Sequence, residues 1–399
     1  MRERSPRTII LLGGAVVLIA MGVRQSFGLF LSPITDDLEI GRETFSLAVA
    51  LQNLIFGLPL VGILADRVGA RAVLFGSGLV YSLGLLLASS MDSVAGIFGA
   101  WGVLPGLALS GASYVVVLGA VGRVVPPERR STAFGLITAA GSFGMFAVVP
   151  LAQWLLSDLG WRDALQVLGI AVGLIAVLGL AFPGRAAHSE VAHLDEPLPT
   201  VLRRAWTHRG YLLLTAGFFV CGFHVAFVAT HLPAYLTDNG LPEFTGATAL
   251  ALIGAFNIVG SSTFGILGDR FRKRNLLSIL YISRAVVFTL FLVIPLTSAS
   301  ALVFGAVIGF LWLATVPLTS GVVAQIFGSR YLSTLYGFTF LSHQVGAFFG
   351  VWLGGRVFDS TGSYDPVWIT AVALSLVAGL IHLPLSDKPL STQPAEATV

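Results

Sequence analysis

The sequence carries little charge and almost no cysteine for a chain of its size. Only 11% of its 399 residues are charged, about half the share in a typical soluble protein, whereas 55% are hydrophobic. The single cysteine, Cys221, excludes an intrachain disulfide and a cysteine cluster for a metal ion. The composition therefore indicates a protein of the lipid bilayer.

Apolar stretches of about 20 residues, the length that crosses a bilayer as a helix, alternate with short polar turns along the chain. We predict twelve transmembrane helices, at residues 8–33, 44–65, 72–91, 94–121, 131–156, 161–183, 210–236, 246–267, 275–297, 299–322, 333–357 and 365–386. The sequence thus predicts an all-α membrane protein made of two six-helix bundles. The bundles are expected at 1–183 and 210–399, with a cytoplasmic linker at 184–209.

The positions of the basic residues predict the orientation of these helices. If the N-terminus lies in the cytoplasm, 18 of the 23 Lys and Arg residues fall in cytoplasmic segments. This asymmetry follows the positive-inside rule and predicts that both termini are cytoplasmic. The net charge of +3 is therefore a topology signal, and it gives no reason to expect nucleic-acid binding.

The two predicted bundles share a repeated charged turn. The segment from Gly62 to Arg71 returns as the segment from Gly265 to Arg274, a shift of 203 positions. Internal duplication of this kind is typical of transporter folds. Small residues also recur four apart in the fourth span, at Gly102, Gly106 and Ser110, and in the eleventh span, where they predict close helix packing.

The repeated turn, with twelve spans and a central linker, resembles the major facilitator superfamily along essentially the whole chain. In that family the turn is linked to switching between inward-facing and outward-facing states. The second copy has Arg272 in place of the second glycine. The residues that match are Gly62, Leu64, Asp66, Arg67, Gly69 and Arg71 in the first copy and Gly265, Leu267, Asp269, Arg270 and Arg274 in the second.

Two further segments, Gly22 to Phe30 and Gly355 to Tyr364, resemble bacterial relatives of the monocarboxylate and oxalate:formate transporters. The resemblance implies a small organic anion as substrate. Mammalian monocarboxylate transporters carry an Asp/Arg pair in the eighth span, where this chain has Asn257 and Ser261. Because this chain lacks the pair, the resemblance does not imply that its eighth span takes part in proton coupling.

Two arginines, Arg24 and Arg284, lie deep inside predicted spans, whereas all 20 acidic residues fall in turns, tails or span ends. A charged side chain at the centre of a bilayer is costly, by roughly 2.5–3.5 kcal/mol on the lower scales. A buried guanidinium without a protein anion favours an anionic ligand, because it can hold a carboxylate with two hydrogen bonds. The alternative for each arginine is a structural bond to backbone carbonyls.

Three histidines, His224, His231 and His343, lie in the seventh and eleventh spans. Because histidine titrates near neutral pH, they are the candidates for proton coupling, with His343 the best placed. The equivalent position in the first half is Gly141, so the His343 side chain does not meet a structural need common to both halves. The alternative is that each histidine only packs and forms hydrogen bonds within the bundle.

Other polar residues of the spans could line a central cavity. Tyr114, Asn257 and Tyr336 join Arg24, Arg284 and His343 as candidate substrate-binding residues. Weaker candidates are Gln25, Phe27, Gln52, Asn53, Ser113, Thr315, Thr339 and Gln344, since membrane amides and hydroxyls often bond only neighbouring helices.

Together these features predict a secondary transporter of the bacterial inner membrane that moves a small organic anion, with a proton, by alternating access. We expect no cofactor or metal, and a monomer. An anion exchanger and an exporter of hydrophobic compounds remain alternatives within this class. A membrane-embedded enzyme or sensor is a more remote one, because the chain has no metalloprotease, serine-hydrolase or phosphate-loop motif.

Overall fold

The computed structural model describes residues 5–58, 61, 64–65, 68–125, 127–182, 184, 198–327 and 332–387. Its regular structure there is helical, which confirms the predicted all-α class. The first half contains α1 (Pro6–Gln25), η1 (Phe27–Phe30), α2 (Leu31–Asp37), α3 (Arg42–Phe56), α5 (Ala70–Ala88), α6 (Val94–Gly96), η2 (Ile97–Val103), α7 (Leu104–Gly111), α8 (Tyr114–Val124) and α9 (Pro127–Gly179). The second half contains α10 (Leu198–Thr207), α11 (Arg209–Asp238), α12 (Glu243–Arg270), α13 (Lys273–Val293), α14 (Ser298–Leu311), α15 (Thr315–Phe327), α16 (Leu332–Thr361) and α17 (Asp365–His382).

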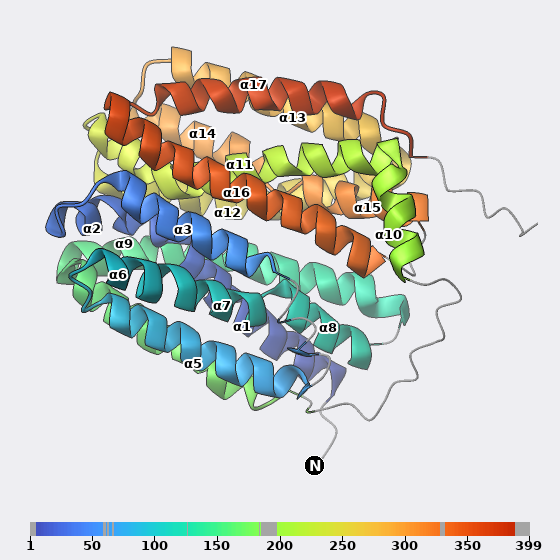
Figure 1. Ribbon diagram of the computed structural model, residues 1–399, viewed down its shortest axis with the longest axis horizontal. Helices are drawn as coiled ribbons and strands as arrows, with labels where there is room; N and C mark the ends of the chain where they lie inside the picture. The colour runs from blue at the N-terminus through green and yellow to red at the C-terminus, as the bar shows by residue number, and fades with distance from the viewer. Residues whose placement is uncertain are drawn as a thin grey trace, which may run out of the picture.

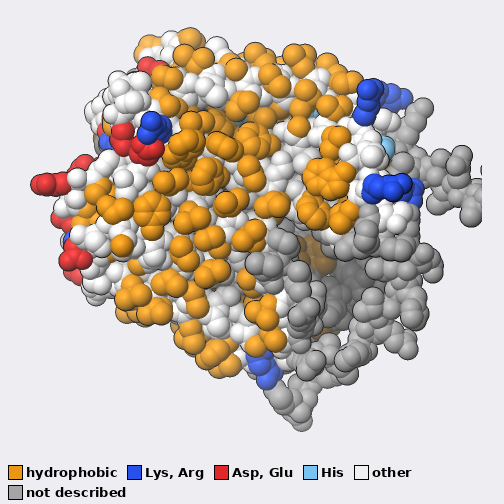
Figure 2. All heavy atoms as spheres, in the orientation of Figure 1, with side chains coloured by type: hydrophobic (Ala, Val, Ile, Leu, Met, Phe, Trp, Pro, Cys, Tyr) orange, Lys and Arg blue, Asp and Glu red, His pale blue; other side chains and the backbone are white. Residues whose placement is uncertain are grey.

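The helices of the two halves lie side by side as two bundles (Figure 1). The start of α1, the helix α10 and the end of α17 lie at one end of the molecule, which we call the linker end. The opposite end, where α3, α12 and α17 begin, is the far end. Hydrophobic side chains cover the face between these ends, acidic side chains gather at the far end, and basic ones mark the linker end (Figure 2).

Some predicted spans do not correspond to one helix each. The predicted first span corresponds to α1, η1 and α2, and the predicted fifth and sixth spans are joined in α9, whose helix is interrupted at Gly160 (φ 78°). Among the described residues, nine helical segments are long and apolar enough to cross a membrane, and one of them, Ala133–Gly179, includes most of both of those spans.

Small residues allow the close helix contacts that the sequence predicts. A Cβ atom added at Gly106 of α7 would lie 3.1 Å from the backbone of Gln52 in α3, and the neighbouring Ser110 donates a hydrogen bond to the Ile55 carbonyl at 2.9 Å. In the second half, Gly350 of α16 meets the Phe223 backbone of α11 in the same way. In lipid, hydrophobic burial does not drive helices together, so close backbone packing of this kind stabilises their association instead.

The predicted linker contains one described helix, α10. Its Val201 and Ala205 are buried in the same core as Tyr211 of α11. Between these helices the His208 ring accepts a hydrogen bond from the Tyr211 backbone N–H at 3.2 Å and so caps α11. Burial lowers the pKa of His208, which favours the neutral ring that this cap requires.

Candidate functional site

A small cavity lies between the two halves. Its lining comes from α1, η1 and α3 of the first half and from α11 of the second half. The volume is about 20 Å³, room for about one water molecule. The residues that line it are Arg24, Gln25, Phe27, Gly28, Val49, Gln52, Asn53, Val225, Ala226, Ala229 and Thr230.

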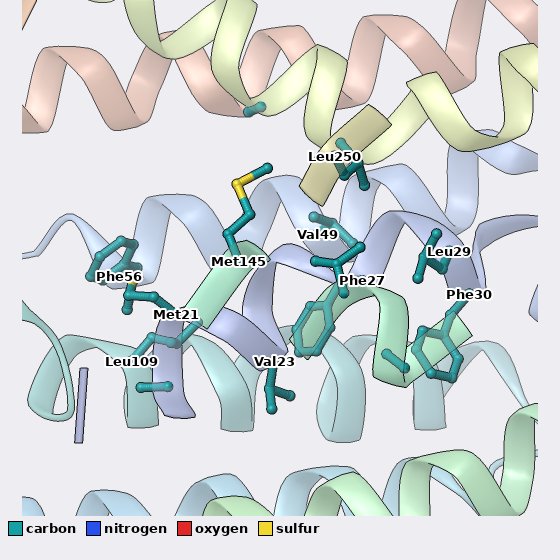
Figure 3. Close-up of a cluster of buried hydrophobic side chains, with 14 of the residues drawn as sticks. Met21, Val23, Phe27, Leu29, Phe30, Val49, Phe56, Leu109, Met145 and Leu250 are labelled. Atoms are coloured by element: carbon teal, nitrogen blue, oxygen red, sulfur yellow. The ribbon is translucent and has the colours of Figure 1, made fainter. Parts of the chain in front are cut away.

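Arg24 is the charged residue of this cavity. It lies in the last turn of α1, where apolar side chains such as Phe56, Val49 and Met145 surround the segment from Met21 to Phe30 (Figure 3). Its guanidinium donates a hydrogen bond to the Asn53 side-chain oxygen and lies 5.3 Å from the centre of the Phe56 ring. The Nε atom is buried without a hydrogen-bond partner, so this cation has donor capacity left for a ligand.

Tyr114, a predicted partner of the substrate, lies beside Arg24. It is the first residue of α8, and its hydroxyl occupies the space that a side chain at Gly141 of α9 would need. Tyr81 of α5 is a second tyrosine near Arg24. Gly141, which the repeat aligns with His343, therefore makes room for a tyrosine in the first half.

His343 lies across the interface from Arg24. Its Nδ1 atom is 3.0 Å from the side-chain oxygen of Gln344, and the Gln344 side-chain nitrogen donates to the Asn53 backbone carbonyl at 3.1 Å. The imidazole packs between two phenylalanine rings, with ring centres 4.8 Å from Phe218 and 5.7 Å from Phe340. The structure therefore connects Arg24 and His343 through Asn53 and Gln344.

Arg284 has a different environment from Arg24. It is 1% exposed, and it donates hydrogen bonds to the carbonyls of Leu311 and Trp312, where the helix breaks between α14 and α15. Its Nε and Nη1 atoms are buried without a partner. Arg284 thus supports a break in the tenth span, and it does not line the cavity at Arg24.

Asn257 holds the same break from the opposite side. Its side-chain oxygen accepts the Leu313 backbone N–H at 3.0 Å, and its side-chain nitrogen donates to Ser142 of α9 at 3.0 Å. Because Ser142 belongs to the first half, Asn257 joins the break in the tenth span to the other bundle. Neither of these contacts places Asn257 in the cavity at Arg24.

The remaining candidates lie within the second half. His224 is 3.0 Å from the Ala371 carbonyl of α17, and His231 is 2.8 Å from the Val351 carbonyl of α16. Tyr336 packs against Phe218, with ring centres 6.0 Å apart. The structure thus brings Arg24, Tyr114 and His343 toward one region and leaves His224 and His231 in separate helix contacts.

The charged turn has the same contact in both halves. Arg71 donates to the Phe182 carbonyl at 2.9 Å, and Arg274 donates to the Leu385 carbonyl at 3.1 Å, in each case just beyond the last helix of its bundle. Gly69 directly precedes α5 and has φ 94°, a conformation that favours glycine. Asp269 and Arg270 are exposed at the end of α12, and Gly62, Asp66 and Arg67 lie outside the described residues.

The sequence did not indicate the contacts that join the halves at the far end. Arg42 of α3 pairs with Asp238 of α11, and the Asp359 carboxylate of α16 accepts the backbone N–H groups of Arg42 and Glu43 at 3.0 and 2.7 Å. Arg356 pairs with Glu43 at 3.1 Å. These five residues form what we call the far-end network, and opposite charges in the outward turns were their only sequence signal.

Comparison with known proteins gives consistent relatives. The sequence profile of the Major Facilitator Superfamily matches residues 13–351. An uncharacterized MFS-type transporter, YcxA of Bacillus subtilis (strain 168), is 26% identical over 96% of this chain and 97% of its own length. Monocarboxylate transporter 13 of Rattus norvegicus is 28% identical over 92% of this chain and 86% of its own length.

Solved structures resemble the whole chain in fold. A bacterial homologue of the human lysosomal transporter Spinster, in an inward-facing and unoccupied conformation, has a TM-score of 0.77 at 13% identity and covers 98% of this chain and 100% of its own. The inward open xylose transporter XylE of E. coli has a TM-score of 0.74 at 13% identity, with coverage of 95% and 96%. At this identity the likeness is one of fold.

Proposed function

Because the chain belongs to the Major Facilitator Superfamily, we propose that it is a secondary active transporter that carries a small organic anion, a monocarboxylate, together with a proton. Its relatives confirm a multi-pass membrane transporter, not an enzyme, and they include the monocarboxylate transporters that the sequence resembles. The observation that carries the proposal is Arg24, a cation without a carboxylate partner among the described residues, in a cavity between the two halves.

The hydrogen bonds of Arg24 favour an anion as its ligand. Asn53 is a neutral acceptor, and it leaves donors of the guanidinium free, including the buried Nε. A carboxylate could take two of these donors in parallel and would neutralise the charge, which is the arrangement that arginine recognises best. Tyr114, beside Arg24, offers a hydroxyl for a second contact with the same ligand.

Arg284 supports the proposal less directly. Its unpaired Nε and Nη1 could donate hydrogen bonds to an anion after the helix break rearranges. Its present hydrogen bonds to the Leu311 and Trp312 carbonyls are structural. We therefore assign the first contact with the carboxylate to Arg24. Arg284, Asn257 and Tyr336 would take part in a later conformation, in which the C-terminal bundle approaches the ligand.

His343 is the residue that we assign to the proton. Importing a monoanion alone against an inside-negative potential costs about 2.3 kcal/mol per 100 mV, and a proton carried with it removes this cost. His343 is buried at the interface and connected to Arg24, whereas His224 and His231 contact carbonyls of their own bundle. The proton and the anion would therefore be bound close together.

The two halves are the bodies that would move during alternating access. We propose residues 1–183 and 210–399 as these bodies and 184–209 as their cytoplasmic connection. Basic residues at the linker end and acidic residues at the far end agree with this orientation in a bacterial inner membrane (Figure 2). We propose that the far-end network closes the outside end of the molecule during this cycle. We expect a monomer without a cofactor.

Uptake into proteoliposomes tests this function. The full chain would be offered labelled lactate, as a monoacid, and labelled oxalate, as a diacid, with and without an inward-acid pH gradient. We expect the gradient to accelerate lactate uptake several-fold. Uptake that ignores the gradient but needs an internal anion would identify an exchanger, and no carboxylate uptake would overturn the proposal.

A further inference from the structure

Two parallel chains of contacts connect Arg24 in the first half to His343 in the second half. In the amide chain, Arg24 bonds to the Asn53 side chain, Gln344 bonds to the Asn53 backbone carbonyl, and His343 bonds to Gln344. Asn53 and Gln344 are both almost fully buried. This chain therefore crosses the interface between α3 and α16 in a buried environment of low dielectric constant, where hydrogen bonds are stronger than in water.

The second chain is aromatic. The Arg24 guanidinium lies over the Phe56 ring, and Phe56 meets Phe340 edge to face with ring centres 5.8 Å apart. Phe340 in turn stacks on the His343 imidazole at an interplanar angle of 9°. The end of α3 is thus held against α16 by both chains, and a Cβ atom at Gly57 would lie 2.7 Å from the Gln344 side chain.

The amide chain determines which nitrogen of His343 carries a proton. A backbone carbonyl can only accept hydrogen bonds, so the Gln344 group that faces the Asn53 carbonyl must be its NH₂. The Gln344 oxygen then faces His343 and requires a hydrogen on Nδ1. In the neutral ring Nε2 is left with a lone pair, and it is the atom to which a transported proton adds.

Protonation of His343 would strengthen this chain. When a proton adds to Nε2, the bond from Nδ1–H to Gln344 becomes charge-assisted and therefore stronger. Other groups also face His343: the Cys221 thiol of α11 interacts with it, and Cys221 lies near Arg284 and Tyr336 and 3.2 Å from the Thr315 hydroxyl. Gln344 is thus the acceptor at Nδ1, and the Cys221 thiol is a second group that bonds to the ring.

We propose that Gln344 and Asn53 are positioning residues that couple protonation of His343 to anion binding at Arg24. The proposal rests on the proposed function. Gln344 would set the tautomer of His343, and Asn53 would hold the guanidinium until a carboxylate replaces its side-chain oxygen. Both contacts involve Asn53 of α3. Binding of a carboxylate at Arg24 therefore changes the hydrogen bonding that positions His343, and protonation of His343 changes the hydrogen bonding at Arg24.

Nitrogen NMR of histidine-labelled full-length protein tests the Gln344 part without any substrate. The His343 signals are identified by their loss in His343→Gln. In the wild type we expect the Nδ1–H tautomer. In Gln344→Leu we expect this preference to disappear and the titration midpoint of His343 to move toward acid by about one pH unit, the size expected for a hydrogen bond to a charged group.

Two further variants keep the test decisive. Gln344→Glu has the same shape and supplies a charge, so we expect its midpoint to move toward alkaline pH. Gln153→Leu is the matched control, because Gln153 is also a buried glutamine that bonds across the halves, to Glu243 at 3.2 Å, far from His343. A His343 spectrum that is the same in Gln344→Leu, Gln344→Glu and the wild type would overturn the role of Gln344.

Transport measurements test the coupling itself. For Gln344→Leu and Asn53→Leu we expect the stimulation of lactate uptake by a pH gradient to fall at least several-fold. Asn53→Leu should keep the wild-type His343 spectrum, because its backbone carbonyl remains. Full gradient stimulation in both variants would refute the coupling. Absence of carboxylate uptake in the wild type would refute the proposed function instead, and the NMR result would still decide the role of Gln344.

Discussion

Arg42 and Asp238 form a bidentate ion pair that joins the first half to the second at the far end. Both guanidinium Nη atoms of Arg42 meet the Asp238 carboxylate, one of them at 2.8 Å, and the Arg42 side chain also donates to the Tyr364 hydroxyl at 3.0 Å. Burial alone would lower the pKa of Arg42. The hydrogen bonds to Asp238 and Tyr364 outweigh this effect, so the pKa lies above its usual value. The cation is therefore permanent.

Breaking this pair should open the far end. A second cavity of about 410 Å³, which we call the far-end cavity, is lined by residues that include Gly28, Arg42, Thr237 and Asp238. In Arg42→Gln we expect maleimide to label a cysteine introduced at Thr237 about fivefold faster, because the lost pair contributes about 1 kcal/mol. The native Cys221 is buried and gives little background. Exchanging the charges in Arg42→Asp with Asp238→Arg should restore part of the slow labelling, and equal rates in all three proteins would contradict a closing role.

Gly28 lines both the cavity at Arg24 and the far-end cavity. A Cβ atom there would collide with the backbone carbonyl oxygens of Ala229 and Thr230 in α11. We therefore expect Gly28→Ala to push η1 away from α11 and to speed labelling at Thr237→Cys. The control is Gly76→Ala, since nothing lies within 4 Å of a Cβ atom at Gly76. Labelling as slow in Gly28→Ala as in this control would show that the contact does not close the path.

Asp359 caps α3 from the other half of the molecule. Its carboxylate accepts the backbone N–H groups of Arg42 and Glu43, which have no acceptor within their own helix. Loss of an N-cap costs about 1 kcal/mol. In Asp359→Ala we expect faster hydrogen exchange at these two amides, measured by mass spectrometry of the peptide that contains them. Asp365→Ala should leave their exchange unchanged, and protection that survives in Asp359→Ala would contradict the cap.

Arg24 and Arg284 should respond differently to the same change. Arg284→Met leaves the Leu311 and Trp312 carbonyls without their donor at the helix break, so we expect its thermal unfolding midpoint to fall by several degrees. Arg24→Met removes a half-buried side chain that lines a cavity, so its midpoint should stay close to that of the wild type. Equal losses in both variants would contradict the structural assignment of Arg284.

Local patterns in the sequence predicted the architecture well. Apolar runs identified the helices, and the repeat linked Arg71 with Arg274, which the structure shows in equivalent contacts with Phe182 and Leu385. These features could be predicted because each depends on residues close together in the chain or on a copy at a fixed distance. The boundaries were less accurate, as at α9, where helical hydrogen bonding continues past the predicted turn and only Gly160 interrupts it.

The partners of the candidate residues could not be predicted in this way. Arg42 and Asp238 are 196 positions apart, and Asn53 and Gln344 are 291 apart, so no local pattern relates them. The sequence also gave Arg24 and Arg284 similar weight, because both are lone cations in apolar helices. Their difference depends on the helix break at Leu311 and Trp312, which supplies carbonyls to Arg284 and none to Arg24.

The central claim is that Arg24 holds a carboxylate between the two halves, in a conformation in which the cavity at Arg24 has widened. Its most direct test is the concentration dependence of labelled lactate uptake in proteoliposomes that contain the wild type, Arg24→Lys or Arg24→Met. We predict that Arg24→Met loses saturable uptake and that Arg24→Lys keeps it with an affinity at least about tenfold weaker, since lysine retains the charge but not the two-pronged geometry. Wild-type affinity in Arg24→Met would contradict the account.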